Sequence, residues 1–167
     1  MTKKNSIILS HQEIKHKIKR IAYQIYESNV DETEVILAGI AVNGYVLAKK
    51  LKTEIGKISD LTPILCKVII DKKQPRNLIL TSIPENDYAN KSVILIDDVL
   101  NSGTTLIYAV KHFLNVPLKR FKTAVLVNRN HKKYPVKADF KGISLSTSLN
   151  EHIRVNFEDN KFEAVLE

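Results

Sequence analysis

The sequence predicts an α/β protein with a mostly parallel, twisted sheet that is flanked by helices. Two observations predict this fold class. Apolar runs of strand length alternate with amphipathic runs of helical length along the chain. The strand-length runs are dense in Val, Ile and Leu, which is typical of parallel strands covered on both faces. We expect a single domain over residues 1–167, because no linker, repeat or low-complexity segment interrupts this order.

Residues 11–28 are predicted to form the first helix. Ser10 and Glu13 have the spacing of a capping box, in which each side chain binds the other residue's backbone N–H. Apolar residues then recur at helical spacing, namely Ile14, Ile18, Ile21, Ala22 and Ile25. The polar segment 29–33 connects this helix to the next element.

A buried strand is predicted at residues 35–40, where every side chain is apolar or small. Asn43-Gly44 then turns the chain into a second helix over 45–54. We expect this helix to end at the segment 56–60, which contains Gly56, Ser59 and Asp60.

The rest of the chain is predicted to contain strands and one further helix, at 104–113. The strands are expected at 61–70, 78–83, 93–96, 121–127, 138–145, 152–157 and 161–166. The first two would form a β-hairpin around a polar turn at 71–77, and the last would be an edge strand. Because ligands bind beyond the carboxyl ends of parallel strands, the loops at 41–44, 100–105 and 128–131 are candidate sites.

The composition is that of a soluble protein without a membrane partner. Hydrophobic residues make up 44% of the chain and charged residues 26%, but no apolar run approaches the about 20 residues that span a bilayer. The apolar run after the N-terminus is too short for a secretory signal. The single cysteine, Cys66, cannot form an internal disulfide, so we expect a reducing, cytoplasmic environment.

Positive charge is concentrated in two stretches of the chain. The formal net charge is +8, and residues 119–141 carry eight Lys or Arg against one acid, Asp139. A second basic run lies at 15–20. Such clustering favours a polyanion, either substrate phosphates or RNA, while a merely solvated basic surface is the alternative.

The segment 93–105 carries the most information about function. A strand of branched apolar residues runs into the adjacent acids Asp97 and Asp98, and a loop of small residues then enters a helix. Unpaired backbone N–H groups at the start of a helix bind anions. Paired acids beside them suit the vicinal hydroxyls of a sugar. The combination predicts a ribose phosphate as ligand.

This segment resembles the phosphoribosyl pyrophosphate (PRPP) signature of the type I phosphoribosyltransferases. A narrower resemblance, to the family of pyrimidine-operon attenuators and uracil phosphoribosyltransferases, covers nearly the whole chain. It is carried by Gly44 and by the segments 7–9, 20–22, 37–40, 47–49, 94–103, 124–131, 135–140, 146–148 and 151–155. The resemblance implies a type I phosphoribosyltransferase fold, with the hairpin at 61–83 as a short hood over the site.

The resemblance also implies an activity, the transfer of ribose 5-phosphate from PRPP to uracil to give UMP and pyrophosphate. Asp97 and Asp98 would be the catalytic acids that hold the ribose. Magnesium would be bound through pyrophosphate and ribose oxygens, with Asp97 or Asp98 as its contact on the protein. The residues implied to bind the 5′-phosphate are Leu100, Asn101, Ser102, Gly103, Thr104 and Thr105. Those implied for pyrophosphate are Ala41, Val42, Asn43 and Gly44, and those for the base are Val127 and Arg129.

The chain departs from the family pattern around the pyrophosphate. Relatives usually have a Lys and an Arg where this chain has Ala41 and Asn43, and an Arg where it has Thr104. The hood segment 71–76 is shorter and lacks a Tyr-Arg-Asp motif, although Lys72, Lys73 and Arg76 offer replacement cations. Asn101 stands where purine-using relatives have an Asp that serves the base nitrogen. Since an amide takes up no proton, uracil is favoured over a purine.

Two other functions stay open. The resembled family also binds a messenger RNA leader, and its basic face corresponds here to Lys19, Arg20, His131, Lys132 and Lys137. A regulator of pyrimidine genes that binds RNA, or that senses nucleotides with weak or no catalysis, is therefore the alternative to the enzyme. Phosphate contacts from these residues would make RNA binding salt-dependent. The resemblance further implies a homodimer or a higher homo-oligomer.

Overall fold

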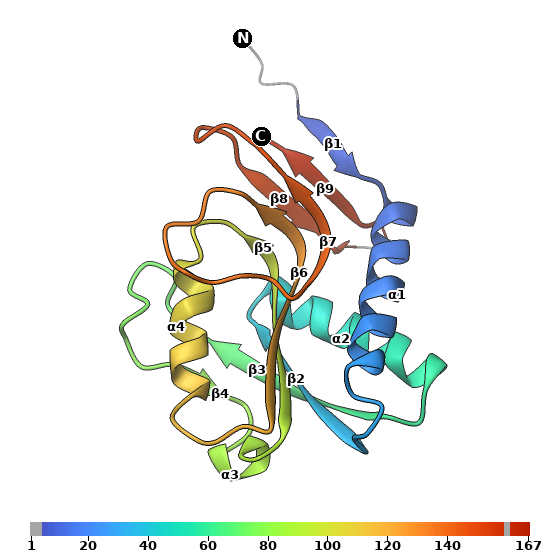
Figure 1. Ribbon diagram of the computed structural model, residues 1–167. Helices are drawn as coiled ribbons and strands as arrows, with labels where there is room; N and C mark the ends of the chain where they lie inside the picture. The colour runs from blue at the N-terminus through green and yellow to red at the C-terminus, as the bar shows by residue number, and fades with distance from the viewer. Residues whose placement is uncertain (1–4, 159–160) are drawn as a thin grey trace.

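The computed structural model describes residues 5–158 and 161–167, which form two β-sheets and four helices (Figure 1). The main sheet has six strands in the order β4-β3-β2-β5-β6-β7. Their bounds are β2 (Glu34–Ile40), β3 (Thr62–Ile69), β4 (Leu80–Thr81), β5 (Ser92–Leu100), β6 (Arg120–Arg129) and β7 (Phe140–Leu145). All neighbours are parallel except β4, which runs antiparallel to β3. The predicted α/β class with a mostly parallel sheet is confirmed.

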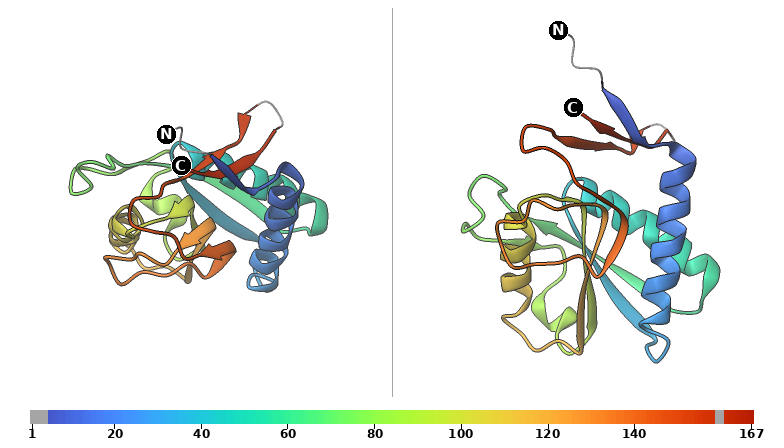
Figure 2. Two further views of the ribbon diagram at one scale, coloured as in Figure 1. Left: turned by 90° about the horizontal axis from the view of Figure 1, so that it is seen from above. Right: turned by 45° about the horizontal axis from the view of Figure 1, so that its top comes forward.

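Helices cover both faces of this sheet (Figure 2). The long helices α1 (His11–Glu27) and α2 (Asn43–Ile58) pack on one face, and α4 (Thr104–Phe113) packs on the other, where the single turn α3 (Glu85–Tyr88) contributes the buried Tyr88. Two separate apolar cores result, one on each side of the sheet. This arrangement explains why the central strands β2 and β5 are buried along almost their whole length.

The start of α1 follows the sequence pattern closely. Ser10 accepts a hydrogen bond from the Glu13 N–H, and the Glu13 carboxylate accepts one from the Ser10 N–H at 2.7 Å. The capping box is therefore confirmed. The buried residues of the helix are the five that the helical spacing predicts, Ile14, Ile18, Ile21, Ala22 and Ile25.

Several boundaries differ from the sequence-based expectation. Helix α2 continues through Gly56 to Ile58, because the buried series Leu47, Leu51 and Ile55 outweighs the about 1 kcal/mol that an internal glycine costs. The return strand of the hairpin, expected at 78–83, has only two residues in the ladder. Strands β5 and β6 each run further than expected and include Asp97, Asp98 and Arg129, since both are paired on two sides.

The C-terminal strands form a second sheet that the sequence did not predict. This sheet has the order β1-β9-β8, with β1 (Ser6–Leu9), β8 (Ile153–Asn156) and β9 (Glu163–Leu166). The expectation of an edge strand at 161–166 is wrong, because β9 lies between β1 and β8 and pairs antiparallel with both. Hydrogen bonding between strands from opposite ends of the chain leaves no pattern in the local sequence, so this sheet could not be predicted. Figure 1 shows this sheet above the main sheet, close to the carboxyl ends of its strands.

Candidate active site

The two predicted catalytic acids lie within β5 near its carboxyl end. Asp97 is buried, with 5% of its surface exposed, and Asp98 is half-buried. The Asp98 N–H donates to Asp97 Oδ1 at 2.9 Å, and the Val99 N–H donates to Asp98 Oδ1 at 2.9 Å. The ladder and these bonds hold the two carboxyl groups in fixed positions.

Residues 100–105, the phosphate loop, connect β5 to α4. Gly103 has φ 85°, a backbone conformation that L side chains rarely adopt, and a Cβ there would meet Val136 Cγ1 at 2.6 Å. Ser102 Oγ and Thr104 Oγ1 are 2.8 Å apart and hydrogen-bond to each other. The Thr104 N–H donates to Ser102 Oγ at 3.3 Å, and the start of α4 is a candidate anion site because the first N–H groups of a helix have no partner within the helix.

A cavity of about 110 Å³ joins the acids to the phosphate loop. It is lined by all residues from Asp97 to Leu106, together with Lys72 and Val125. All six predicted 5′-phosphate residues and both acids thus lie around one cavity. Lys72 comes from the hood, and its Nζ lies 3.9 Å from Asp97 Oδ1.

Asp97 has unusual electrostatics. Burial and, after it, the neighbouring Asp98 carboxyl group raise its pKa to about 8, although Lys72 acts in the opposite direction. A carboxyl group in this setting stays largely protonated at neutral pH in the free protein. Shifts of this kind are frequent at functional sites.

Residues 41–44, the pyrophosphate loop, connect β2 to the start of α2 beside the acids. The peptide bond between Ala41 and Val42 is cis. Asn43 Nδ2 donates to Asp98 Oδ2 at 3.0 Å and to the Val155 carbonyl of β8 at 2.9 Å, so it joins this loop to both sheets. A Cβ on Gly44 would meet the Ile96 carbonyl oxygen at 2.6 Å, and only glycine allows this close approach to β5.

The predicted base-binding residues lie at the end of β6, next to β5. Val127 is buried in the core, while Asn128 and Arg129 are buried polar residues. The Arg129 side chain donates to Asn101 of the phosphate loop and to the segment that follows β7. Sequence reasoning missed that segment, residues 146–151, as part of the site, because its contacts with Arg129 depend on tertiary structure.

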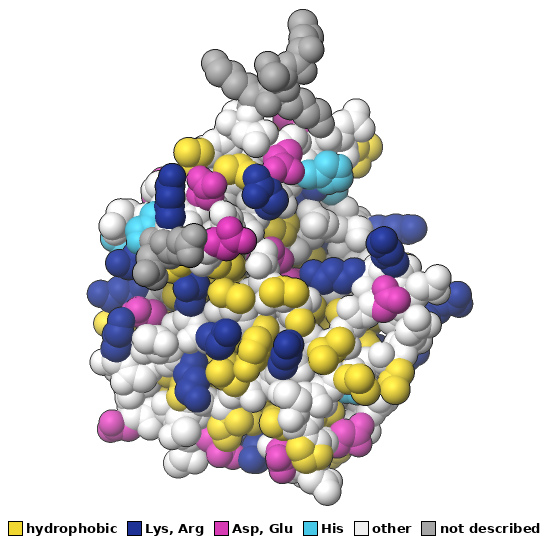
Figure 3. Space-filling view, turned by 180° about the vertical axis from the view of Figure 1, so that it is seen from behind, with side chains coloured by type: hydrophobic (Ala, Val, Ile, Leu, Met, Phe, Trp, Pro, Cys, Tyr) yellow, Lys and Arg dark blue, Asp and Glu magenta, His cyan; other side chains and the backbone are white. Residues whose placement is uncertain are grey.

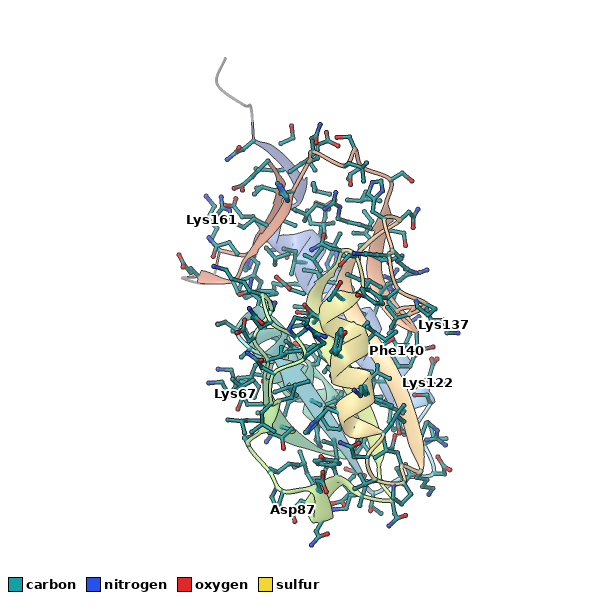
Figure 4. All side chains as sticks on the ribbon, turned by 90° about the vertical axis from the view of Figure 1, so that its left-hand side faces the viewer. Lys67, Asp87, Lys122, Lys137, Phe140 and Lys161 are labelled. Carbon is teal, nitrogen blue, oxygen red and sulfur yellow. The ribbon has the colours of Figure 1, made fainter. Side chains whose placement is uncertain are left out.

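The predicted RNA-binding residues do not form one free face. Arg20 donates to the carbonyls of Lys141 and Gly142 at 2.8 and 2.6 Å, and the His131 ring binds the Thr147 carbonyl. Lys137 lies 3.5 Å from Asp139 and is mostly exposed. Figure 4 shows its side chain on the outside of the molecule, on the same side as Lys122. Lys132 is exposed, and Lys19 faces a groove between α1 and α2.

Comparison with known proteins agrees with this geometry. An acidic pair beside a candidate anion loop, at the carboxyl edge of a parallel α/β sheet, is compatible with a phosphoribosyltransferase. Residues 4–160 match the phosphoribosyl transferase domain, so the chain belongs to this family. Within the family it is a PyrR-like type I member. It is 32% identical over 162 residues to the bifunctional protein PyrR of Macrococcus caseolyticus, covering 92% of both chains. It is 34% identical over 150 residues to that of Streptococcus mutans, covering 86% of this chain and 83% of the relative.

Solved structures share the fold at lower sequence identity. A hypoxanthine phosphoribosyltransferase of Trypanosoma cruzi aligns with a TM-score of 0.79 at 15% identity, over 95% of both chains. A hypoxanthine-guanine phosphoribosyltransferase of Bacillus anthracis aligns with a TM-score of 0.75 at 19% identity, over 95% of this chain and 96% of that one. Identities this low are informative about fold alone. Among the described residues, no helix has the length and apolar character needed to cross a membrane.

Proposed function

We propose that this protein transfers the 5-phosphoribosyl group of PRPP to uracil, giving UMP and pyrophosphate. The observation that carries the proposal is the cavity in which both acids of β5 lie beside the whole phosphate loop. The phosphate loop would bind the 5′-phosphate through the N–H groups at the start of α4, where the helix dipole favours an anion. Asp97 and Asp98 would hold the ribose hydroxyls.

The leaving group would lie at the pyrophosphate loop, at the carboxyl end of the neighbouring strand β2. No side chain caps the start of α2, and N–H groups at the start of a helix suit an anion. Ala41 and Asn43 bring no charge, and residues 41–44 do not line the cavity of the acids, but Asn43 contacts Asp98 at its edge and Lys72 enters it from the hood. Lys72 is therefore the cation that we propose in place of the missing pair.

In this reaction the bond between ribose C1 and the pyrophosphate oxygen breaks, and its electron pair leaves with the pyrophosphate. N1 of uracil forms the new bond to C1, and its proton leaves with the released pyrophosphate. The Asp98 carboxylate would stabilise the positive charge that develops on the ribose, and the loops would hold the reactants in line.

The family generally uses magnesium with PRPP, and the side chains here fit that requirement. Magnesium prefers oxygen ligands and is usually held by one or two carboxylates together with substrate phosphates. Asp98 provides one carboxylate, and Asp97 would provide a second on losing its proton to a bound cation. No group of three or more His, Cys, Asp or Glu side chains that could form a closed metal site occurs in the described ranges. When bound, magnesium would neutralise pyrophosphate charge.

Nucleotide formation tests this function directly. Purified protein would be incubated with PRPP, magnesium and one of uracil, orotate, hypoxanthine, guanine or adenine. We expect UMP with uracil and no nucleotide with the other bases, because Asn101 cannot take up a proton from a purine. A purine nucleotide as the main product would overturn the choice of acceptor.

A regulatory function with RNA as partner is the second candidate, and one surface favours it. The basic groove, a cavity of about 600 Å³ between α1 and α2, is lined by Lys15, His16, Lys19, Lys50 and Lys57. Its single acid, Glu54, is already paired with Lys57 at 3.0 Å. The Phe162 ring lies under Lys50 Nζ at 3.9 Å, so the groove offers cations for a phosphate backbone.

RNA binding would be measured by the fluorescence anisotropy of a labelled single-stranded RNA. We expect affinity to fall steeply between about 50 and about 200 mM salt, since each phosphate contact releases a counterion. The triple variant Lys15→Gln, Lys19→Gln, Lys50→Gln should weaken binding, whereas Lys111→Gln with Lys122→Gln, outside the groove, should not. Equal loss in both variants would show that net charge, and not the groove, attracts RNA.

A further inference from the structure

Arg129 is a buried cation that joins two parts of the site. Only 6% of its surface is exposed. Its Nη1 donates to Asn101 Oδ1 at 3.0 Å, and its Nε donates to Thr147 Oγ1 at 2.9 Å. Its Nη2 donates to the carbonyls of Ser148 and Glu151 at 3.1 and 2.7 Å. One side chain thus connects the phosphate loop to the segment after β7.

That segment, residues 146–151, has no regular structure of its own and is held mainly by the end of β6. Besides the bonds from Arg129, Asn130 Nδ2 donates to Ser146 Oγ at 3.2 Å, and His131 binds the Thr147 carbonyl. Three consecutive residues therefore hold the segment in place. We call residues 146–151 the acceptor wall, because they border the side from which we expect an acceptor base to approach.

The sheet order indicates where an acceptor base would enter, given the proposed function on which this inference rests. Strand β5 lies between β2 and β6. If the leaving pyrophosphate lies at the end of β2 and the ribose at the end of β5, the attacking atom has to approach C1 from the opposite side. That side is the end of β6, where residues 128–131 and the acceptor wall lie.

Arg129 also fixes the orientation of the Asn101 amide. A guanidinium group only donates hydrogen bonds, so Asn101 must turn its Oδ1 toward Arg129 and keep its Nδ2 group for another partner. Asn101 lines the cavity. A donor at this position suits a base that carries a carbonyl oxygen next to the reacting nitrogen, where negative charge gathers as that nitrogen loses its proton.

We propose that Arg129 is a positioning residue for the acceptor base. It sets the distance between the acceptor wall and the phosphate loop, and it orients Asn101 so that the site presents an N–H donor to an oxo-pyrimidine. It does not touch the 5′-phosphate itself, so its loss should weaken binding of the base far more than binding of ribose 5-phosphate.

The test compares the dissociation constants of UMP and ribose 5-phosphate by titration calorimetry, which needs no turnover. In Arg129→Lys the charge remains but the forked geometry is lost. We expect UMP to bind about tenfold more weakly and ribose 5-phosphate to change less than about threefold. The uracil KM should rise in parallel wherever turnover is measurable. Arg154→Gln, at an exposed arginine on β8 that pairs with Glu167, is the matched control and should change neither ligand.

Two further variants separate the parts of the inference. Thr147→Val removes only the acceptor of Nε and should give a smaller loss in the same direction, so it replaces Arg129→Lys if that variant does not fold. Asn101→Asp keeps an oxygen for Arg129 but removes the outward donor. Asn101→Asp should therefore lower the affinity for UMP more than the affinity for ribose 5-phosphate. The change in ribose 5-phosphate affinity measures how far the new charge repels the phosphate.

Each outcome decides the inference. If Arg129→Lys lost affinity for UMP and for ribose 5-phosphate equally, the role of Arg129 would be purely structural. If neither affinity changed, Arg129 would have no role in binding. Either result would overturn the inference. If the wild-type protein bound UMP but formed no nucleotide, the proposed catalysis would be overturned. The ratio of UMP affinity to ribose 5-phosphate affinity would still test the role of Arg129. Wild-type protein that binds neither ligand would overturn both.

Discussion

At the scale of single residues, the site depends on how the neighbouring acids of β5 differ in environment. Asp97 is buried beside Asp98 and near the hood lysine Lys72, whereas Asp98 is half-buried and accepts a hydrogen bond from Asn43. Burial and the neighbouring Asp98 raise the pKa of Asp97. The sequence predicts the pair but not this difference, because burial and the reach of Lys72 depend on tertiary structure.

Replacement of Asp98 by Asn tests its role in holding the ribose. The change keeps the shape and an oxygen for the Val99 N–H, but its amide nitrogen takes the place of the Oδ2 that accepts from Asn43. The protein should still fold, with a free energy of unfolding lower by about 1 to 2 kcal/mol at most. PRPP-dependent activity should fall by about a hundredfold or more, since a charge that stabilises the transition state is lost. Asp60→Asn, at an exposed bend, is the control. Full activity of Asp98→Asn in the assay with uracil would contradict this role.

The raised pKa of Asp97 predicts how stability depends on pH. In the unfolded chain this carboxyl group has a pKa of about 3.9, and in the folded protein burial raises the pKa to about 8. Between these values the folded protein holds a proton that the unfolded chain has released. The free energy of unfolding therefore falls as pH rises through this window.

The variant Asp97→Asn carries no such proton and should lack this dependence. In magnesium-free buffer, its melting temperature relative to wild type should increase steadily from about pH 5 to about pH 8. Thermal unfolding followed by circular dichroism at several pH values measures the difference. A difference that stays constant across the window would show that Asp97 is already ionised in the folded protein.

At the scale of elements, local patterns predicted most of the parallel sheet and its helices. The capping box fixed the start of α1, and the small-residue loop fixed the start of α4 at Thr104. The wrong elements share one cause, which is pairing between distant segments. Strand β9 lies between β1 and β8 because the two ends of the chain meet, and the acceptor wall enters the site through bonds from Arg129.

Gly103 allows an element-scale test of the phosphate loop. An alanine there would be strained at φ 85° and would press against Val136, so Gly103→Ala should cost about 1 to 3 kcal/mol of stability. Affinity for ribose 5-phosphate should fall with it. Gly56→Ala is a matched control inside α2, where a Cβ would have open space, and it should stabilise the protein by about 0.5 to 1 kcal/mol. Denaturant unfolding measures whether the free energy of unfolding falls in Gly103→Ala and rises in Gly56→Ala.

At the scale of the whole molecule, exposed apolar side chains and basic side chains occur close together. The basic groove runs between α1 and α2. Figure 3 shows apolar side chains gathered among lysines and arginines on the face seen from behind, over α2 and β3. Val42, Ile69 and Leu80 are exposed apolar residues, and Ile69 lies opposite Leu80 in the β3–β4 ladder. The Ala41 N–H donates to the Val68 carbonyl, which places Val42 next to this pair.

The homodimer that the family resemblance implies needs a contact surface, and we predict that the apolar cluster of Val42, Ile69 and Leu80 is part of it. The three side chains are 75%, 49% and 52% exposed, so a second copy of the chain would bury apolar surface here. Ile69→Lys should therefore convert a dimer into a monomer of 19.0 kDa, because an unpaired charge at an interface is strongly unfavourable. Leu114→Lys, at a residue that is 61% exposed after α4, should leave the dimer intact. Sedimentation velocity measures both masses.

A wild-type protein that stays monomeric at high concentration, or a dimer that survives Ile69→Lys, would contradict the assignment. Because the apolar cluster borders the pyrophosphate loop through Val42, a true dimer contact should also change PRPP affinity when it is broken.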